Sequence, residues 1–220
     1  VALDLRRDGL PRVTNAELQA AFALEFRAHA HRRIGRALGK RVLQQVVEVE
    51  AEAGAVAVHD GALYLLGGEV GFVCSPYPGC DPPYFNDVWR TTDGKTWKRL
   101  TKSAAWSPRP GHQCESVAVQ DQPTIVCFGG FGQGENPIDV WASTDGTSWK
   151  ALDSKPWNAT VPEEGRYDFD STVVSVPRAS GTVPAIITVG GDRETFNFGA
   201  PDNWLRVDDD VWWFVPTPST

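Results

Sequence analysis

Short apolar runs separated by turn residues recur three times along this chain. The apolar run 63–66 ends in the double glycine 67–68, and the arrangement returns with double glycines at 129–130 and 190–191. Each double glycine is followed, after a polar connection, by the tripeptide Asp-Val-Trp. The first glycines stand at positions 67, 129 and 190, so the spacing is 62 residues and then 61. A period of this length, built from short apolar runs and turns, predicts a repeat fold.

Each repeat is predicted to consist of β-hairpins. The first hairpins join 55–58 to 62–66, 116–119 to 124–128 and 171–176 to 185–189, and the second hairpins join 88–92 to 96–100 and 140–144 to 148–152. Asp60-Gly61 predicts a two-residue turn, because glycine adopts positive φ without strain, and the Asp-Gly pairs at 93–94 and 145–146 predict tight turns in the second hairpins. Four antiparallel strands in each repeat are the unit of a propeller blade.

The first 53 residues follow a different pattern. A strand is predicted at 1–5, and a capping box at 14–17 begins a helix whose apolar residues recur every four positions as far as Gly39. A second strand is predicted at 42–49. Strand, helix and strand predict a small α/β unit with one long helix over residues 1–53.

The repeats carry a family resemblance. Residues 54–215 resemble kelch repeats, because strand two ends in Gly-Gly, strand three opens with Asp-Val-Trp, and strand four carries a tryptophan. The segment 107–112 (SPRPGH) also fits, and 165–168 (GRYD) is a looser version. The resemblance implies a mainly β fold, in which about three four-stranded antiparallel blades of a partial kelch-type β-propeller follow the α/β unit. The implied blades span about 54–100, 111–152 and 165–215. Residues 1–53 resemble the small βαβ modules of some cell-surface proteins.

The resemblance also implies roles for the repeated residues. In the kelch family the diglycines let neighbouring blades approach closely, and aromatic residues pack between blades. The repeated positions here are Gly67, Gly68, Gly129, Gly130, Gly190, Gly191, Asp87, Asp139, Asp210, Trp89, Trp141, Trp212, Trp97 and Trp149. We expect the tryptophans to pack between blades, and the aspartates to bond turn backbone rather than share a metal ion.

Composition limits the partners that this chain can have. A charged fraction of 22% and a hydrophobic fraction of 41% are typical of a globular protein, and the net charge of −7 argues against a nucleic-acid binder. No apolar run is long enough to span a membrane. There is no methionine, so we expect the chain to be a piece of something longer. Three repeats do not close a propeller, and the remaining blades are expected from the same longer polypeptide or another chain. Residues 216–220 (PTPST) resemble the start of a linker.

The four cysteines point to an oxidising compartment. Cys74 and Cys80 flank a short loop, and Cys114 and Cys127 fall on adjacent predicted strands, so the pairs 74–80 and 114–127 are favoured. Four reduced thiols are the alternative. The glycosylation sequon at Asn158 adds to the case for an extracellular or cell-surface protein.

A binding face is predicted where the connections between strands two and three emerge, because these connections are long and unequal. Their aromatic residues are Phe72, Tyr77, Tyr84, Phe131, Phe196, Phe198 and Trp204. Acidic residues accompany the last group, which suits a protein partner or a glycan. The alternative is that these rings fold back onto the blades.

The sequence favours a non-catalytic module that binds proteins in a matrix, coat or filament. Two enzyme alternatives are a copper radical oxidase resembling galactose oxidase and a sialidase, whose Asp-box turns resemble 92–97 and 144–149. The residues that either activity requires cannot be identified, and no cofactor is expected. An intracellular kelch adaptor is the remaining alternative.

Overall fold

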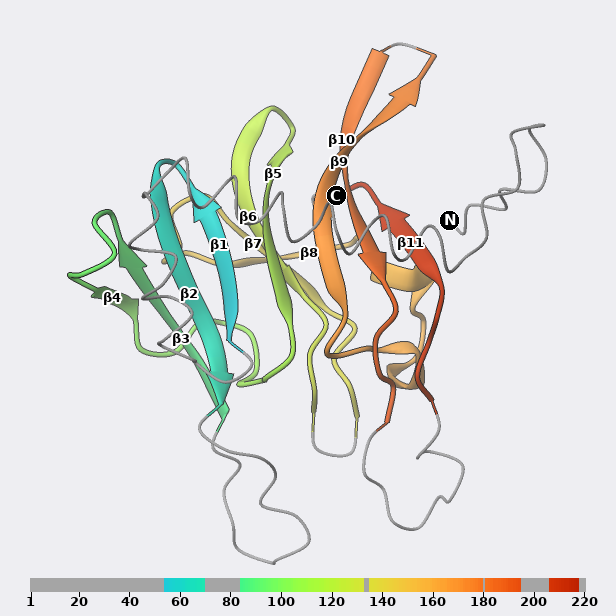
Figure 1. Ribbon diagram of the computed structural model, residues 1–220, viewed down its shortest axis with the longest axis horizontal. Coiled ribbons are helices and arrows are strands. Elements are labelled where there is room, and N and C mark those ends of the chain that lie inside the picture. The colour runs from blue at the N-terminus through green and yellow to red at the C-terminus, as the bar shows by residue number, and fades with distance from the viewer. Residues whose placement is uncertain (1–53, 70–83, 133–134, 180, 195–205, 218–220) are drawn as a thin grey trace, which may run out of the picture.

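A computed structural model describes residues 54–69, 84–132, 135–179, 181–194 and 206–217 (Figure 1). This part of the chain is mainly β and forms three antiparallel sheets. The α/β unit predicted over residues 1–53, with its long helix, lies outside the described residues.

The first sheet comprises four strands in chain order. These are β1 (Ala55–His59), β2 (Ala62–Glu69), β3 (Tyr84–Thr91) and β4 (Lys98–Thr101). The turn between β1 and β2 has φ of 45° at Asp60 and 69° at Gly61, which is the two-residue hairpin that the sequence predicted.

The second sheet repeats this topology. Its strands are β5 (Gln113–Val119), β6 (Gln122–Phe128), β7 (Val140–Ser143) and β8 (Lys150–Leu152). Cys114 lies directly opposite Cys127 across β5 and β6, and the two form a disulfide with an Sγ–Sγ distance of 2.03 Å. The predicted 114–127 pair is therefore confirmed, whereas the predicted 74–80 pair lies outside the described residues.

The third sheet has three described strands. Two short 3-10 helices, η1 (Pro156–Asn158) and η2 (Pro162–Glu164), precede β9 (Asp170–Arg178), β10 (Gly181–Val189) and β11 (Val211–Phe214). The β9–β10 hairpin is longer than predicted, because Pro177 and Pro184 stay in the paired strands instead of ending them. After β11 the chain turns to the second sheet, where the Thr217 N–H donates to Ser154 Oγ.

The turns between the third and fourth strands differ from the prediction. They span six residues between Thr91 and Lys98 and again between Ser143 and Lys150, so they are longer than the turns predicted between strand ends at 92 and 96 and at 144 and 148. Side chains replace the missing ladder bonds: the Gly94 N–H donates to Thr91 Oγ1 at 2.9 Å, and the Lys95 and Thr96 N–H groups donate to Asp93 Oδ1 at 2.8 Å each. These two backbone bonds lower the pKa of Asp93 to about 2. Ser143, Asp145 and Gly146 form the same arrangement in the second sheet.

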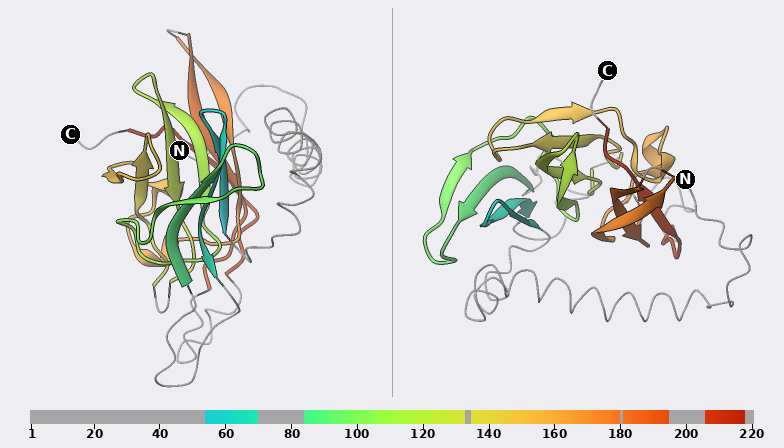
Figure 2. Two further views of the ribbon diagram at one scale, coloured as in Figure 1. Left: turned by 90° about the vertical axis from the view of Figure 1, so that its left-hand side faces the viewer. Right: turned by 90° about the horizontal axis from the view of Figure 1, so that it is seen from above.

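The three sheets lie side by side, with one hydrophobic core between the first and second sheets and another between the second and third (Figure 2). Strand β6 contributes to both cores, because successive side chains point to opposite faces of a sheet. Ile125 and Cys127 pack toward the first sheet, while Val126 and Phe128 pack toward the third. The first strands are neighbours, with β1 beside β5 and β5 beside β9. Polar bonds join them, including Ser171 Oγ to Glu115 Oε1 at 2.9 Å.

The diglycines lie where neighbouring sheets approach most closely. A Cβ atom on Gly67 would lie 2.8 Å from the Phe85 carbonyl oxygen and 3.0 Å from His112 Cε1. A Cβ atom on Gly129 would lie 2.4 Å from the Phe169 ring. His112 precedes β5 and Phe169 precedes β9, so the first and second diglycines each lie against the segment that leads to the next sheet.

A pair of glycine variants separates this close approach from backbone strain. Gly61 and Gly129 have nearly equal φ of 69° and 70°, but a Cβ on Gly61 would meet nothing within 4 Å. Gly61→Ala should cost about 1–2 kcal/mol from the left-handed backbone alone. Gly129→Ala should cost about 1–3 kcal/mol more, because the added methyl group overpacks against Phe169. Denaturant unfolding of both variants measures the difference, and equal losses would contradict the close approach.

Candidate functional site

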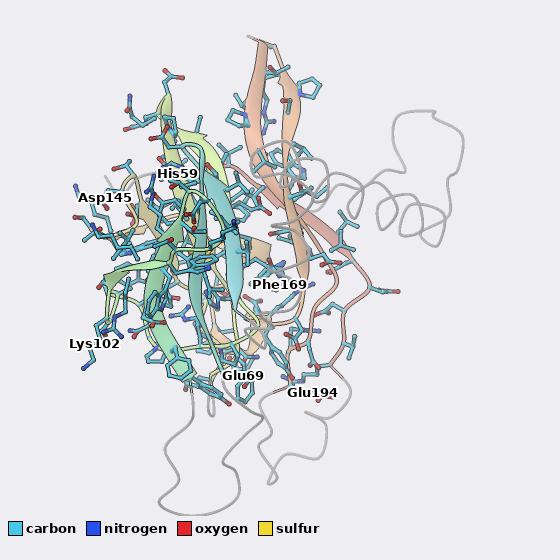
Figure 3. All side chains as sticks on the ribbon, turned by 60° about the vertical axis from the view of Figure 1, so that its left-hand side comes forward. His59, Glu69, Lys102, Asp145, Phe169 and Glu194 are labelled. Atoms are coloured by element: carbon cyan, nitrogen blue, oxygen red, sulfur yellow. A yellow bond between two sulfur atoms is a disulfide. The ribbon has the colours of Figure 1, made fainter. Side chains whose placement is uncertain are left out.

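The predicted binding face lies at one end of the sheets, which we call the diglycine end. It is the end where β2, β6 and β10 finish, at or within two residues of the diglycines 67–68, 129–130 and 190–191, and where the third strands begin. Figure 3 shows Glu69 and Glu194 at this end and His59 at the other. The predicted residues Phe72, Tyr77, Phe196, Phe198 and Trp204 lie outside the described residues.

Three aromatic rings form a continuous row at the diglycine end. Tyr84 and Phe131 have ring centroids 6.0 Å apart, and Phe131 and Tyr167 have ring centroids 5.2 Å apart, both edge to face. Phe131 is 4% exposed and Tyr167 is 7% exposed, so these rings pack inward. For Phe131 the alternative of a ring folded back onto the sheets is therefore correct, and Tyr84 is half-buried.

Acidic side chains surround this aromatic row. Burial and the neighbouring Asp192 carboxylate raise the pKa of Tyr167, and burial with Glu69 raises the pKa of Tyr84. Desolvation and the charge of Asp192 also raise the pKa of Asp168 and of Glu194. Negative charge is thus concentrated beside the tyrosines, which favours partners that bring positive charge or hydrogen-bond donors.

A buried arginine joins the first and second sheets beside this row. Arg109 is 2% exposed, and its backbone N–H donates to the Phe85 carbonyl oxygen of the first sheet. Its guanidinium bonds both carboxylate oxygens of Asp139 at 2.5 and 3.1 Å and the Gly129 carbonyl oxygen at 3.2 Å, all in the second sheet. The Trp141 indole N–H donates to the same carboxylate at 2.7 Å.

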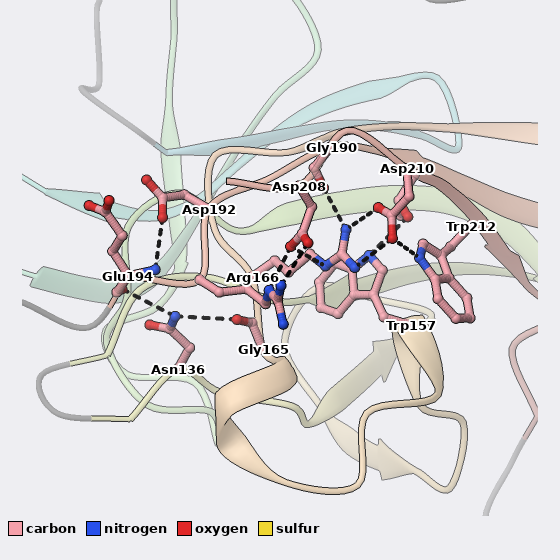
Figure 4. A network of polar contacts seen from close by, with 12 residues as sticks. Asn136, Trp157, Gly165, Arg166, Gly190, Asp192, Glu194, Asp208, Asp210 and Trp212 are labelled. Carbon is pink, nitrogen blue, oxygen red and sulfur yellow. Dashed lines mark hydrogen bonds and ion pairs between the residues drawn. The ribbon is translucent and has the colours of Figure 1, made fainter. Parts of the chain in front are cut away.

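The same arrangement joins the second and third sheets (Figure 4). The Arg166 carbonyl oxygen accepts from the Gly130 N–H of the second sheet. The Arg166 guanidinium bonds the two oxygens of Asp210 at 2.5 and 3.0 Å and the Gly190 carbonyl oxygen at 3.1 Å. Trp212 donates to Asp210 at 2.6 Å, which completes the match with the second sheet. Asp208 also lies 3.3 Å from Arg166 Nε.

The repeated aspartates have side-chain partners that the sequence did not predict. Asp139 and Asp210 accept from an arginine and a tryptophan, and Asp87 in the first sheet accepts from Trp89 Nε1 at 2.7 Å. For Asp139 and Asp210, desolvation acts to raise the pKa, but the bonds from arginine and tryptophan lower it overall. Each of these aspartate carboxylates orients the tryptophan or arginine side chain that donates to it.

The repeated tryptophans mainly pack against the cores between sheets. Trp141 and Trp149 lie against the core between the first two sheets, and Trp212 lies against the other core. Trp89 lies under the Arg99 guanidinium, 5.3 Å from ring centroid to Cζ, and Trp97 is half-buried.

His112 is a second buried group at the contact between the first two sheets. It is 2% exposed, and its ring lies 5.4 Å from the Trp106 ring, centroid to centroid. Burial and the nearby charge of Arg109 lower the pKa of His112 to about 3. The imidazole is therefore neutral at physiological pH and serves packing.

Comparisons with known proteins add no identity to this geometry. No protein-family model matches the chain, and no curated protein matches it. Within the described ranges, no group of three or more His, Cys, Asp and Glu side chains is placed to hold a metal ion. In the same part of the chain, helices long and apolar enough for a membrane span are absent. The sequon residue Asn158 is the last residue of η1.

Sequence reasoning missed the roles of Arg109, Arg166 and Tyr167. The signal was present, because each arginine stands four residues before the first strand of its sheet. Their segments were recognised as matching, but a single sequence does not show which acceptor a guanidinium reaches. His112 and Phe169 also occupy matching positions, three residues after the arginines.

The buried neutral His112 predicts acid sensitivity of folding. Its folded pKa of about 3 lies below the unfolded value of about 6.5, so below pH 6.5 the unfolded state binds the proton first. Stability should fall by up to about 1.4 kcal/mol per pH unit between pH 6.5 and pH 3. His112→Phe, which copies Phe169, should remove this component. Urea unfolding from pH 8 to pH 4 measures it.

The reciprocal variant is the control for this prediction. Phe169→His should lose packing at every pH and should also gain acid sensitivity, because the introduced imidazole is buried in the matching place. Equal pH profiles for the wild type and His112→Phe would contradict the assignment.

Proposed function

We propose that this chain is part of a kelch-type β-propeller that binds other proteins in an extracellular or cell-surface matrix, coat or filament. The observation that carries the proposal is the diglycine end, where half-buried Tyr84 and acidic side chains from neighbouring sheets gather beside long connections. Aromatic and charged residues on a fixed scaffold suit recognition of a protein surface or, as a second option, a glycan.

A propeller arrangement accounts for how the sheets meet. The first strands are neighbours, hydrophobic cores fill the space between sheets, and the first and second diglycines lie against the segments that lead to the next sheets. Three sheets leave the ring open, so the remaining blades come from a longer form of the same polypeptide or from another chain.

An extracellular or surface location is supported by the disulfide between Cys114 and Cys127, since such bonds persist in oxidising compartments. The sequon at Asn158 agrees with this location. The rival is an intracellular kelch adaptor with reduced thiols.

The propeller is proposed to be non-catalytic and to need no cofactor. The sequences of the turns 92–97 and 144–149 resemble the Asp-box turns of sialidases, which keeps a sialidase-like enzyme as a second candidate. A glycosidase screen tests that candidate, and copper content tests one resembling galactose oxidase.

Thiol counting separates the extracellular proposal from the intracellular rival. In protein from its native source, alkylation without reductant should leave Cys114 and Cys127 unlabelled, and a peptide carrying glycan at Asn158 should be found. Mass spectrometry with and without reductant reads both. Four free thiols together with an unmodified Asn158 would reject the extracellular location.

Cross-linking tests which face binds partners. A carboxyl-reactive reagent applied to the native assembly should link Glu69, Asp192 or Glu194 to other proteins, because they lie at the diglycine end. Asp60 and Asp121, exposed in the turns at the opposite end, are the matched controls. Cross-links confined to Asp60 and Asp121 would place the interface at the opposite end and would refute the proposed interface at the diglycine end.

A further inference from the structure

The first sheet contains the acceptors of an arginine site, but no arginine among the described residues bonds them. In the second and third sheets, an arginine guanidinium donates hydrogen bonds to an aspartate carboxylate and to the carbonyl oxygen of the first diglycine residue. A tryptophan indole N–H donates to the same carboxylate and orients it. The corresponding residues of the first sheet are Gly67, Asp87 and Trp89, which we call the Asp87 site.

The φ angles of the diglycine at the Asp87 site match those at the two occupied sites. Gly67 and Gly68 have φ of 55° and 111°, compared with 70° and 109° at Gly129 and Gly130 and 64° and 111° at the third pair. The Trp89 indole N–H donates to Asp87 Oδ2 at 2.7 Å, as Trp141 does to Asp139 Oδ2 at 2.7 Å. The carboxylate is therefore held by the same bond that holds it in the occupied sites.

The chain has no arginine at the equivalent place. Arg109 and Arg166 stand four residues before Gln113 and Asp170, which pair with the residue preceding each diglycine. In the first sheet Ala55 has that pairing, and four residues before it the sequence has Ala51. Among the described residues, Trp89 is the one hydrogen-bond donor to the Asp87 carboxylate.

We propose that the Asp87 site receives an arginine from a protein partner that packs against the outer side of the first sheet. Both occupied sites are filled by a segment that contacts two sheets at once, since Arg109 also bonds Phe85 and Arg166 also bonds Gly130. An arginine is required because its planar guanidinium bonds two carboxylate oxygens and a carbonyl together, which a lysine ammonium does not. The inference rests on the proposed protein-binding function and names the chemistry of one contact.

A peptide copied from this chain is the probe. A fluorescent heptapeptide with the sequence of residues 107–113 (SPRPGHQ) carries the arginine in the context that fills the second sheet's site. Anisotropy titration with the full chain should show saturable binding. Asp87→Asn should weaken binding by roughly tenfold or more, because charge-assisted bonds are lost. The asparagine oxygen still accepts from Trp89, so the variant should fold, as circular dichroism checks.

Two matched controls keep the result specific. Asp121→Asn, in the exposed turn after β5, should bind the peptide as the wild type does. A peptide with lysine in place of arginine should bind wild type at least about tenfold more weakly. Absence of saturable binding, equal affinity of Asp87→Asn, or equal affinity of the lysine peptide would each overturn the inference. None of these outcomes bears on the thiol and cross-linking tests of the proposed function.

Discussion

The close approach of one sheet to the next at Gly67 and at Gly129 is the constraint on which the rest depends. Gly129 has no side chain where the Phe169 ring lies, and Gly67 has none where His112 lies. With larger residues there, the sheets would separate and their cores would lose contacts, since interiors tolerate little overpacking. The arginines, the tryptophans and the aromatic row all lie beside these contacts. Their geometry follows from the backbone spacing that glycine permits.

Arg109 and Arg166 supply direction to contacts that hydrophobic packing alone would leave less defined. A buried guanidinium is costly unless every donor is satisfied, and here it is paired with a carboxylate and a backbone carbonyl. Each arginine also bonds the preceding sheet through its own backbone. The register of one sheet on the next is thus fixed by directional bonds, while the cores between sheets supply most of the buried apolar surface.

Much of the fold could be predicted because it is local and repeated. Alternating apolar residues and the Asp60-Gly61 turn defined the β1–β2 hairpin, and register placed Cys114 opposite Cys127. The turns at 92–97 and 144–149 could not be predicted from Asp-Gly alone, because side-chain bonds from Thr91 and Ser143 lengthen them. The arginine contacts were missed because they join residues 30 and 44 positions apart along the chain. Such pairing depends on how the sheets pack, which a single sequence does not reveal.

The first and third sheets each depart from the repeated pattern of contacts, and these departures bear on what could pack beside them. In the first sheet, Asp87 keeps its tryptophan partner but the chain has Ala51 where the other repeats have arginine. In the third sheet, no Asp-Gly turn follows Trp212, and Thr217 instead bonds Ser154 of the second sheet. The middle sheet has a complete set of contacts on both faces. An aspartate that is oriented for a guanidinium contributes less binding energy without one, because the bidentate pairing makes such hydrogen bonds strong. The proposed arginine of a partner would complete an existing arrangement in the first sheet rather than create a new one.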